Sequence, residues 1–392
     1  MKKILSVFSA LGAIVFLCAP WLLQSNTHYH RLIILLAWVP AAFQCAFFWR
    51  DFKCSFDRGF WVFYLFVSLW YCFSVLVNDG TSELRELKIP FYIAFFLLSF
   101  WGMGVFLKEK SLHVLLGCAV LGGFLALLSL VSFYFVDENF FHARAVSFGL
   151  WNKWIPAGQV VGVLMIICAG LGLRSDQRSW VLVLVCISLF GYLAFLLGNQ
   201  TRWVWISVVV GFVALALTFR NRVFFLGVGC LLAVAVCVFV FIPESFFERG
   251  VSHRPAIWMG GVKLFLQNWV VGLGLEGGEI VIYDGLIISH PHNMFLDIAI
   301  KFGLMGFLLW SVLWFYVGWK AFCYRSLVLG KTIIALWVYS GVVVLTDGIA
   351  PWEKPAPIWF VTWLPMALAL MLPATSVAEE CSSFKVSDGA GG

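Results

Sequence analysis

The sequence alternates between long apolar stretches and short polar segments. An α-helix needs roughly 20 apolar residues to cross a bilayer, and about twelve stretches meet this criterion. They are expected at residues 4–23, 31–49, 59–78, 89–107, 112–136, 155–173, 179–198, 203–219, 223–243, 293–319, 332–350 and 356–372. The pattern therefore predicts an all-α polytopic membrane protein with about 12 transmembrane helices.

The longest polar connection covers residues 244–292. Its segment from Arg254 to Trp269 carries a broad apolar stripe at helical spacing, which predicts an amphipathic helix at the membrane–water boundary. Pro255 suits the first turn of this helix, so Arg254 is expected at its start. The chain then divides into a bundle of about nine transmembrane helices at 1–243, the loop at 244–292, further transmembrane helices at 293–372 and a disordered tail at 373–392.

Composition agrees with the membrane class. The chain has 392 residues, of which 62% are hydrophobic and 12% are charged, whereas soluble proteins carry about 25% charged residues. The 20 tryptophans and 40 phenylalanines fit aromatic belts at the two membrane surfaces. The 11 cysteines show no CxxC spacing, so we expect neither a disulfide framework nor a zinc site.

Basic residues predict how the chain is oriented. With a cytoplasmic N-terminus, 15 of the 26 lysines and arginines fall in the inner segments, including RDFKCSFDR, KEK, RSDQR and RNR. Short cytoplasmic connections carry such an excess of cations. Both termini are therefore predicted to be cytoplasmic. The loop 244–292, the connection 137–153, Arg202 and Asp347 are then expected on the outer side.

Two arginines stand at the starts of outer helices. Arg202 precedes Trp203 at the start of the predicted span 203–219, and Arg254 opens the amphipathic segment. Either arginine could anchor the chain at the lipid headgroups. A helix N-terminus favours anions rather than cations, however, because of the helix dipole. An arginine at this position therefore suggests that an anion binds between its side chain and the helix end.

The second group of polar residues comprises His290, His292 and Asn293, just before a long apolar helix that also carries Asp297 and Lys301. A histidine at a helix mouth is often only a polar cap. Two histidines could also ligate a metal together with His253 or Asp297, but their spacing fits no standard metal site, and no metal is predicted. Asp297 and Lys301 are four residues apart and can pair along one helix face.

Three stretches together resemble the O-antigen ligase and O-antigen polymerase superfamily of membrane glycosyltransferases. The stretch NQTRWVW around Arg202 resembles the family's Ser-Arg-Gly-x-Trp segment. Arg254-x-x-x-Trp258 followed by NWVVGLG resembles its Arg-x-x-x-Trp … Pro-x-x-Gly-x-Gly segment, with Trp269 in place of the proline. The stretch HNMFL followed by FGLMG resembles its His-Asn-x-x-Leu … Gly-x-x-Gly segment. The resemblance covers residues 199–306.

The resemblance implies transfer of a glycan from an undecaprenyl-pyrophosphate carrier to a sugar hydroxyl on the periplasmic side of the bacterial inner membrane. The loop 244–292 would then be the periplasmic catalytic loop. Arginine binds phosphate oxygens in a bidentate manner, so Arg202 and Arg254 are assigned to the donor pyrophosphate. His292 is the expected general base, and His290 is a second candidate. Asn293 and Asp347 are expected to support the base or the acceptor.

In this interpretation the partners are the undecaprenyl-pyrophosphate-linked glycan, a lipid A–core acceptor and membrane lipids, with no cofactor and no nucleic acid. The size of the outer loop favours a ligase, which acts in lipopolysaccharide biosynthesis. An O-antigen polymerase or a related oligosaccharyltransferase shares the same chemistry and stays open as an alternative. A lipid-linked glycan transporter is less favoured because few ionisable residues lie in mid-span. A non-catalytic scaffold would make His292 dispensable.

Overall fold

The computed structural model describes residues 2–53, 55–78, 84–137, 143–173, 177–241, 254–275, 277, 279–281 and 287–373. Within this part of the chain, 10 helices are long and apolar enough to cross a membrane. The predicted class, an all-α polytopic membrane protein, is confirmed. The predicted tail lies beyond the described residues, apart from Pro373.

The N-terminal helices are α1 (Lys2–Leu22), α2 (Asn26–Ile33), η1 (Ile34–Trp38), α3 (Val39–Lys53), α4 (Arg58–Asn78), η2 (Leu84–Lys88), α5 (Ile89–Leu107), α6 (Lys110–Val131) and η3 (Ser132–Val136). The central ones are α7 (Trp154–Gly172), α8 (Ser179–Asn199), α9 (Arg202–Phe219) and α10 (Arg222–Phe241). The C-terminal part contains α12 (Arg254–Gln267), β1 (Ile280–Val281), β2 (Ile287–Ile288), α13 (Met294–Cys323), α14 (Val328–Asp347) and α15 (Ile358–Val361).

Ten of the twelve predicted spans coincide with these long helices. The other two, 223–243 and 356–372, correspond in the described residues to the shorter apolar helices Arg222–Val234 and Trp363–Pro373. Thr362, the C-cap of α15 at φ −117° and ψ −70°, lies between α15 and the last of these helices. The predicted final span is therefore two short helices rather than one.

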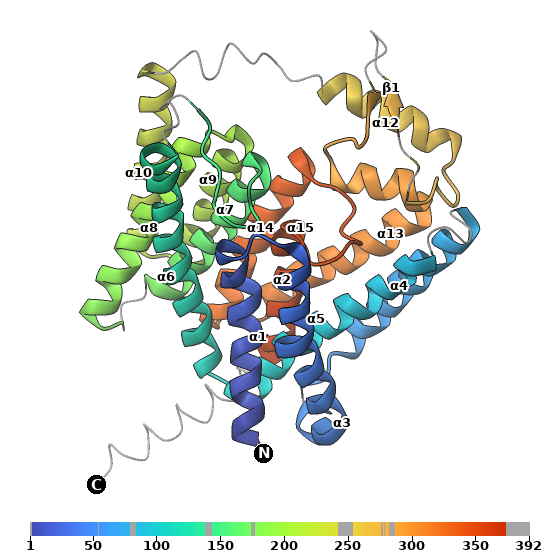
Figure 1. Cartoon of the computed structure of the whole chain (residues 1–392), viewed down its shortest axis with the longest axis horizontal. Coiled ribbons are helices and arrows are strands. Elements are labelled where there is room, and N and C mark those ends of the chain that lie inside the picture. The colour runs from blue at the N-terminus through green and yellow to red at the C-terminus, as the bar shows by residue number, and fades with distance from the viewer. Residues whose placement is uncertain are drawn as a thin grey trace.

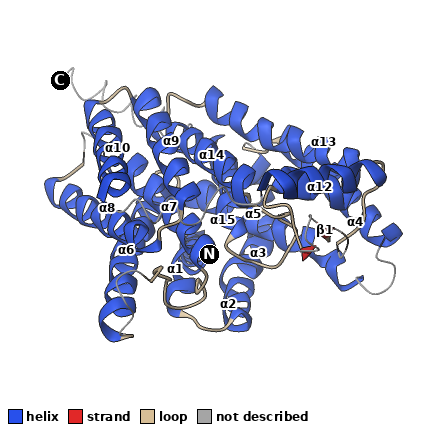
Figure 2. Ribbon diagram, turned by 90° about the horizontal axis from the view of Figure 1, so that it is seen from above, coloured by secondary structure: helices blue, strands red, loops and turns tan. Residues whose placement is uncertain are grey.

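The helices form two groups, with further helices between them (Figures 1 and 2). Helices α6 to α10 lie on one side, α4, α12 and α13 lie on the other, and α1, α2 and α5 lie between them. Helix α7 is enclosed by α6, α8, α9 and α14, and its residues from Ala157 to Gly172 are all buried. A helix that is apolar all round is suited to such a position.

Helix α13 is interrupted at Gly303, where the backbone takes φ 67° and ψ −171°. Such a break frees carbonyl groups that need new partners inside a membrane. Groups from outside the helix supply them: Leu273 N donates to Ile300 O (2.9 Å), Gly274 N to Lys301 O (3.0 Å), and Trp70 Nε1 to Phe302 O (2.8 Å). The first half of α13 is thereby fixed to both the loop and α4.

The glycine run in the loop makes this contact possible. A side chain on Gly272, at φ 84°, would meet the backbone of Lys301, and one on Gly303 would meet the carbonyl of Val270. Glycine is needed at both positions because the backbones approach closely and φ is positive. The glycine run therefore lies directly against the backbone of α13.

The predicted helix of the loop is confirmed as α12, and it starts at Arg254 as expected. Its apolar stripe does not form one face, however. Ile257 packs in a small cluster with Ile280 and Ile300, whereas Trp258 and Leu266 are exposed on the surface. The stripe is divided because α13 covers one side of the helix. In Figure 1, α12 and β1 lie at the end of the molecule opposite the N-terminal end of α1.

Candidate functional site

The centre of the site is a histidine–carboxylate pair. Nδ1 of His292, just before α13, lies 2.7 Å from Oδ1 of Asp347, the last residue of α14. The His292 side chain is 30% exposed and that of Asp347 is 11% exposed. Nε2 of His292 makes no hydrogen bond within the described residues. A carboxylate at Nδ1 fixes the orientation of the ring, and it leaves Nε2 as the nitrogen that can accept a proton.

His290, the second candidate base, is in direct contact with His292. Its Nδ1 accepts a hydrogen bond from the backbone N–H of His292 (3.3 Å), and the two ring centroids are 4.2 Å apart. Burial, followed by the neighbouring His292, lowers the pKa of His290. A neutral ring with Nδ1 as acceptor suits this bracing role.

The backbone of His292 is itself unusual, because its φ is 52°. Few residues other than glycine adopt this left-handed region, and such strain occurs often at functional sites. The hydrogen bond that the backbone N–H of His292 donates to Nδ1 of His290 offsets part of this strain. The turn brings the imidazole to Asp347 across 55 residues of sequence.

Asn293 has a structural role at this point. Its side-chain oxygen accepts from the backbone N–H of Leu296 (3.1 Å), which makes it the N-cap of α13. The sequence placed Asn293 among the residues that support the base. In the structure, Asn293 fixes the start of the helix directly after His292.

The position of Asp347 is set by the buried helix α7. Gln159 Nε2 donates to the carbonyl oxygen of Asp347 (2.8 Å), and the hydroxyl of Tyr339 donates to the carbonyl oxygen of Gln159 (2.8 Å). Gln159 is 5% exposed. Buried hydrogen bonds of this kind hold the end of α14 in a single position.

A buried ion pair fixes the segment that follows Asp347. Oδ2 of Asp297 accepts from the backbone N–H of Ala350 (2.7 Å) and from Nζ of Lys301 (3.1 Å). Asp297 is 1% exposed, and such a charge is tolerated only when it is paired and hydrogen-bonded. The pairing of Asp297 with Lys301 that the sequence predicted is confirmed. Its contact with the segment after α14 was not predicted, because no local pattern connects α13 to residue 350.

Arg254 lies in the same neighbourhood. Its guanidinium carbon is 4.8 Å from the ring centroid of Trp203, the residue after Arg202. Burial lowers the pKa of Arg254, whereas the charge of Asp347 acts in the opposite direction. Nη1 of Arg254 is buried and has no hydrogen-bond partner among the described residues.

Arg202 is the first residue of α9, as the sequence predicted. It follows a tight turn in which Gln200 ends α8 with φ 55°. Trp203 connects the two arginines, since it follows Arg202 in the chain and stacks under Arg254. The structure therefore brings Arg202, Arg254, Asp347 and His292 to one region.

A third arginine, Arg144, was missed by the sequence reasoning. Its Nε donates to the carbonyl oxygen of Asn199 (3.1 Å) and its Nη2 to Oγ1 of Thr201 (2.9 Å). The guanidinium also lies 4.8 Å from the ring centroid of Trp154. Arg144 thus fixes the turn from which Arg202 emerges. It lies in the connection 137–153, which the charge pattern had assigned to the same side.

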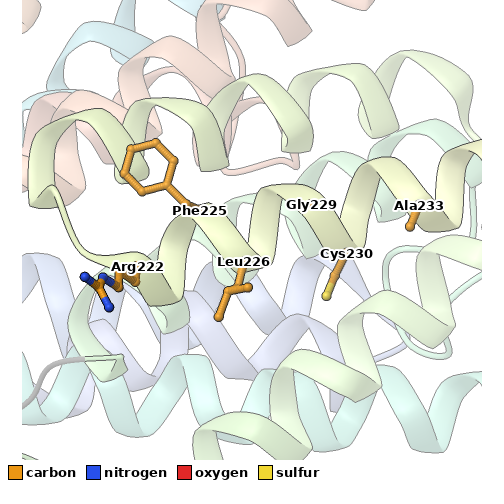
Figure 3. A pocket seen from close by; sticks show the side chains of 6 residues that line it. All are labelled: Arg222, Phe225, Leu226, Gly229, Cys230 and Ala233. Carbon is orange, nitrogen blue, oxygen red and sulfur yellow. The ribbon is translucent and has the colours of Figure 1, made fainter.

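Neither metal-binding residues nor the groove on α10 provides a further site in the described part of the chain. In the described part of the chain, no three His, Cys, Asp or Glu residues are grouped to hold a metal ion; His253 lies outside that part. A groove on α10 is lined by Arg222, Phe225, Leu226, Gly229, Cys230 and Ala233 (Figure 3). Because all six come from one helix and five are apolar or small, this groove is ordinary lipid-facing surface.

Fold and site together define a class: a helical membrane protein that brings a histidine–carboxylate pair and cationic guanidinium groups together. Comparison with known proteins agrees with this class. Residues 163–311 match the family model described as O-antigen ligase. This range contains Arg202, Arg254, His290 and His292, whereas Asp347 lies beyond it.

The similarity is not restricted to that range. The chain is 25% identical over 369 residues to an O-antigen ligase of Pseudomonas aeruginosa, covering 92% of this chain and 90% of the relative. The chain is thus similar to an O-antigen ligase over nearly its whole length. The resemblance predicted from the three motifs is confirmed.

Proposed function

We propose that this protein is a metal-independent, inverting glycosyltransferase. It moves O-antigen glycan from undecaprenyl pyrophosphate to a sugar hydroxyl of lipid A–core at the periplasmic face of the inner membrane. One observation carries the proposal. The His292–Asp347 pair, with its 2.7 Å contact, lies within electrostatic range of Arg254, whose buried Nη1 lacks a partner among the described residues.

The His292–Asp347 pair supports general-base catalysis. Nε2 of His292 accepts the proton of the acceptor hydroxyl as its oxygen forms a bond to the anomeric carbon. The bond between that carbon and the pyrophosphate oxygen breaks, and its electron pair leaves with the pyrophosphate. Attack from the opposite face inverts the configuration. Asp347 stabilises the imidazolium that forms and holds the ring in the required tautomer.

The arginines supply the positive charge that the leaving group requires. Pyrophosphate gains negative charge as the glycosidic bond breaks, and arginine forks stabilise charged phosphate oxygens. Arg202 adds its charge at the N-terminus of α9, where the helix dipole also favours an anion. A phosphate oxygen would give the buried Nη1 of Arg254 the partner that it lacks. The guanidinium groups thereby perform the role that a metal ion has in other phosphate-handling sites.

The O-antigen ligases with which the chain shares sequence favour lipid A–core as the acceptor. A polymerase or a related oligosaccharyltransferase would use the same base and the same arginines, and only the acceptor would differ. The arrangement of charge argues against a transporter. The described ionisable residues of the site gather at helix ends rather than along a path through the membrane.

A reconstituted transfer assay tests this function. Purified protein receives undecaprenyl-pyrophosphate oligosaccharide with or without lipid A–core, in the presence of a chelator. The proposal expects glycan on lipid A–core despite the chelator. Lengthening of the lipid-linked glycan without lipid A–core would indicate a polymerase. Loss of transfer in the chelator, restored by a divalent cation, would contradict the metal-independent mechanism.

A further inference from the structure

A second group of polar and aromatic residues lies apart from the arginines, where α2, η1 and α5 meet. The rings of Trp38 and Tyr92 are stacked with centroids 4.6 Å apart. The imidazole of His30 approaches both rings edge-on, with centroid distances of 5.3 Å to Trp38 and 5.1 Å to Tyr92. Residues from two separate helical segments thus build one aromatic corner.

Two nitrogens of this corner are unsatisfied. Nε2 of His30 and Nε1 of Trp38 are buried and have no hydrogen-bond partner within the described residues. Trp38 is 4% exposed, and it ends a π-helical turn, η1. Buried polar groups in native proteins are almost always hydrogen-bonded, and π-turns often occur at functional sites. Two unsatisfied nitrogens in one corner therefore indicate a ligand that provides the missing partners.

Two lysines give the corner a positive charge. Lys354 and Lys88 are both close enough to His30 to act on it electrostatically. Neither lysine forms a salt bridge or a side-chain hydrogen bond with a described residue. Of the neighbouring acids, Glu86 contacts Arg85 at 3.4 Å. Burial raises the pKa of Glu353 to about 7, which reduces the negative charge of Glu353 near neutral pH. We call His30, Trp38, Lys88, Tyr92 and Lys354 the basic aromatic site.

The basic aromatic site lies at helix ends. His30 lies in α2, the eight-residue helix with which its span begins. Lys88 directly precedes α5, and Lys354 follows α14. Helix ends are at the level of the lipid headgroups. The charge pattern of the sequence assigns all three ends to the outer side, the same side as Arg202 and Asp347.

A short segment connects this site to the histidine–carboxylate pair. Residues 347–354 run from Asp347 to Lys354, and the backbone of Ala350 in between is held by Asp297. Trp352 anchors the same segment, because its ring packs against Phe302 and Trp310 with centroid distances of 5.1 Å and 5.0 Å. A ligand at Lys354 is therefore held at a fixed position relative to His292.

We propose that the basic aromatic site binds the phosphorylated sugar headgroup of an anionic glycolipid in the outer leaflet. Lysine binds phosphate as a compact point charge, and the indole N–H of Trp38 and the imidazole of His30 complete the contacts. This inference rests on the proposed function in one respect, because the proposed glycan transfer makes that glycolipid the acceptor. The arginines then hold the donor pyrophosphate while the lysines hold the phosphate of the acceptor.

Direct binding tests the site without requiring transfer. Purified protein in detergent is incubated with a phosphorylated glycolipid acceptor or with its enzymatically dephosphorylated form, and bound lipid is quantified. The double variant Lys88→Gln, Lys354→Gln should bind the phosphorylated form at least about tenfold more weakly, as expected when charge-assisted contacts are lost. Lys110→Gln, an exposed lysine at the start of α6, serves as the matched control and should bind normally.

Further binding measurements define the ligand. Trp38→Phe keeps a ring but removes the N–H, so it should also weaken binding of the phosphorylated form. Excess inorganic phosphate should not displace the lipid, and full displacement would assign the site to free phosphate instead. Equal affinity of wild type and double variant, or equal affinity for the two lipid forms, would overturn the proposal.

The outcome separates this inference from the proposed function. Phosphate-dependent binding that is lost in the double variant, combined with no glycan transfer by the wild type, would support the basic aromatic site and contradict the proposed transferase activity. Transfer by the wild type, together with an unchanged KM for the acceptor in the double variant, would support the proposed transferase activity and contradict the basic aromatic site.

Discussion

Arg254 is the residue whose environment is most clearly incomplete. It is held over Trp203 and its Nη1 is buried without a partner among the described residues. A lysine at this position keeps the charge but lacks the planar fork that binds two phosphate oxygens. We therefore expect Arg254→Lys to lower kcat/KM for the donor by about tenfold or more, while the KM for the acceptor stays unchanged.

The same substitution at Arg202 gives a parallel test, because the sequence assigned both arginines to pyrophosphate. Donor kinetics of purified Arg202→Lys and Arg254→Lys check the expectation. Arg325→Lys, at an exposed position after α13, is the control. Full activity in either of the two site variants would contradict bidentate binding of the pyrophosphate by that arginine.

Asp347 allows a prediction at the level of a single proton. Replacing it by asparagine keeps the size of the side chain but removes the charge that stabilises a protonated His292. Asp347→Asn should lower the rate of transfer by about 10²- to 10⁴-fold, the usual range for loss of base catalysis. Steady-state rates with saturating donor and acceptor measure the effect, and a rate within twofold of wild type would contradict the role.

Single residues also show where sequence reasoning stops. Arg202, Arg254 and His292 could be identified because each lies in a recognisable local motif. Asp347 was assigned to the same side as Arg202 and the loop 244–292, but its 2.7 Å contact with His292 depends on how α13 and α14 pack. Arg144 and Gln159 act through backbone groups of distant segments. No local pattern of residue types encodes such contacts.

Among the elements, the interrupted helix α13 is the one that shapes the site. Gly303 has φ 67°, and a side chain there would meet the carbonyl of Val270. Gly303→Ala should therefore destabilise the protein by at least about 1–2 kcal/mol from the backbone conformation alone. Thermal unfolding in detergent measures this change.

A matched control exists on α6, where a side chain on Gly117 would meet no atom within 4 Å. Gly117→Ala replaces a poor helix former in mid-helix and should be neutral, or stabilising by up to about 1 kcal/mol. Equal unfolding temperatures for the two alanine variants would contradict the role of Gly303 as the break in α13.

The segment after α14 provides a prediction on pH. Burial raises the pKa of Glu353 from 4.5 to about 7, although Lys301 acts in the opposite direction. The folded state therefore holds this proton more tightly than the unfolded state does. The contribution of Glu353 to stability is most favourable below pH 4.5, and it declines as the pH rises to above 7.

Thermal unfolding of the wild type and of Glu353→Gln between pH 5 and pH 8 checks this sign. The wild type should lose stability relative to the variant as the pH rises. A difference between them that stays constant over this range would show that Glu353 is charged throughout.

For the whole molecule, apolar patterning was sufficient to predict the class and most spans, because the bilayer restricts a spanning chain to helices of defined length. It failed at residues 356–372, where Thr362 separates two short helices. It predicted the helix α12, but packing against α13 decides which of the apolar residues of α12 are buried and which are exposed. The orientation with two cytoplasmic termini stays a prediction.

The whole molecule also explains how residues far apart in sequence reach one site. The buried helix α7 positions Asp347 through Gln159, and α13 positions His292 and Asp297. The turn before α9 presents Arg202, and α12 carries Arg254. In the proposed mechanism, these separate segments must fold together before donor, acceptor and base can meet, so the proposed chemistry depends on the complete helix bundle.

The rate of glycan transfer by His292→Ala is the most direct test of His292 as the general base. The variant and the wild type are purified from membranes in equal amounts and assayed with undecaprenyl-pyrophosphate oligosaccharide and lipid A–core. We expect a rate lower by about 10²- to 10⁴-fold, with unchanged abundance in the membrane and unchanged donor binding. Transfer at the wild-type rate would contradict the assignment of His292 as the base, and with it the site described above.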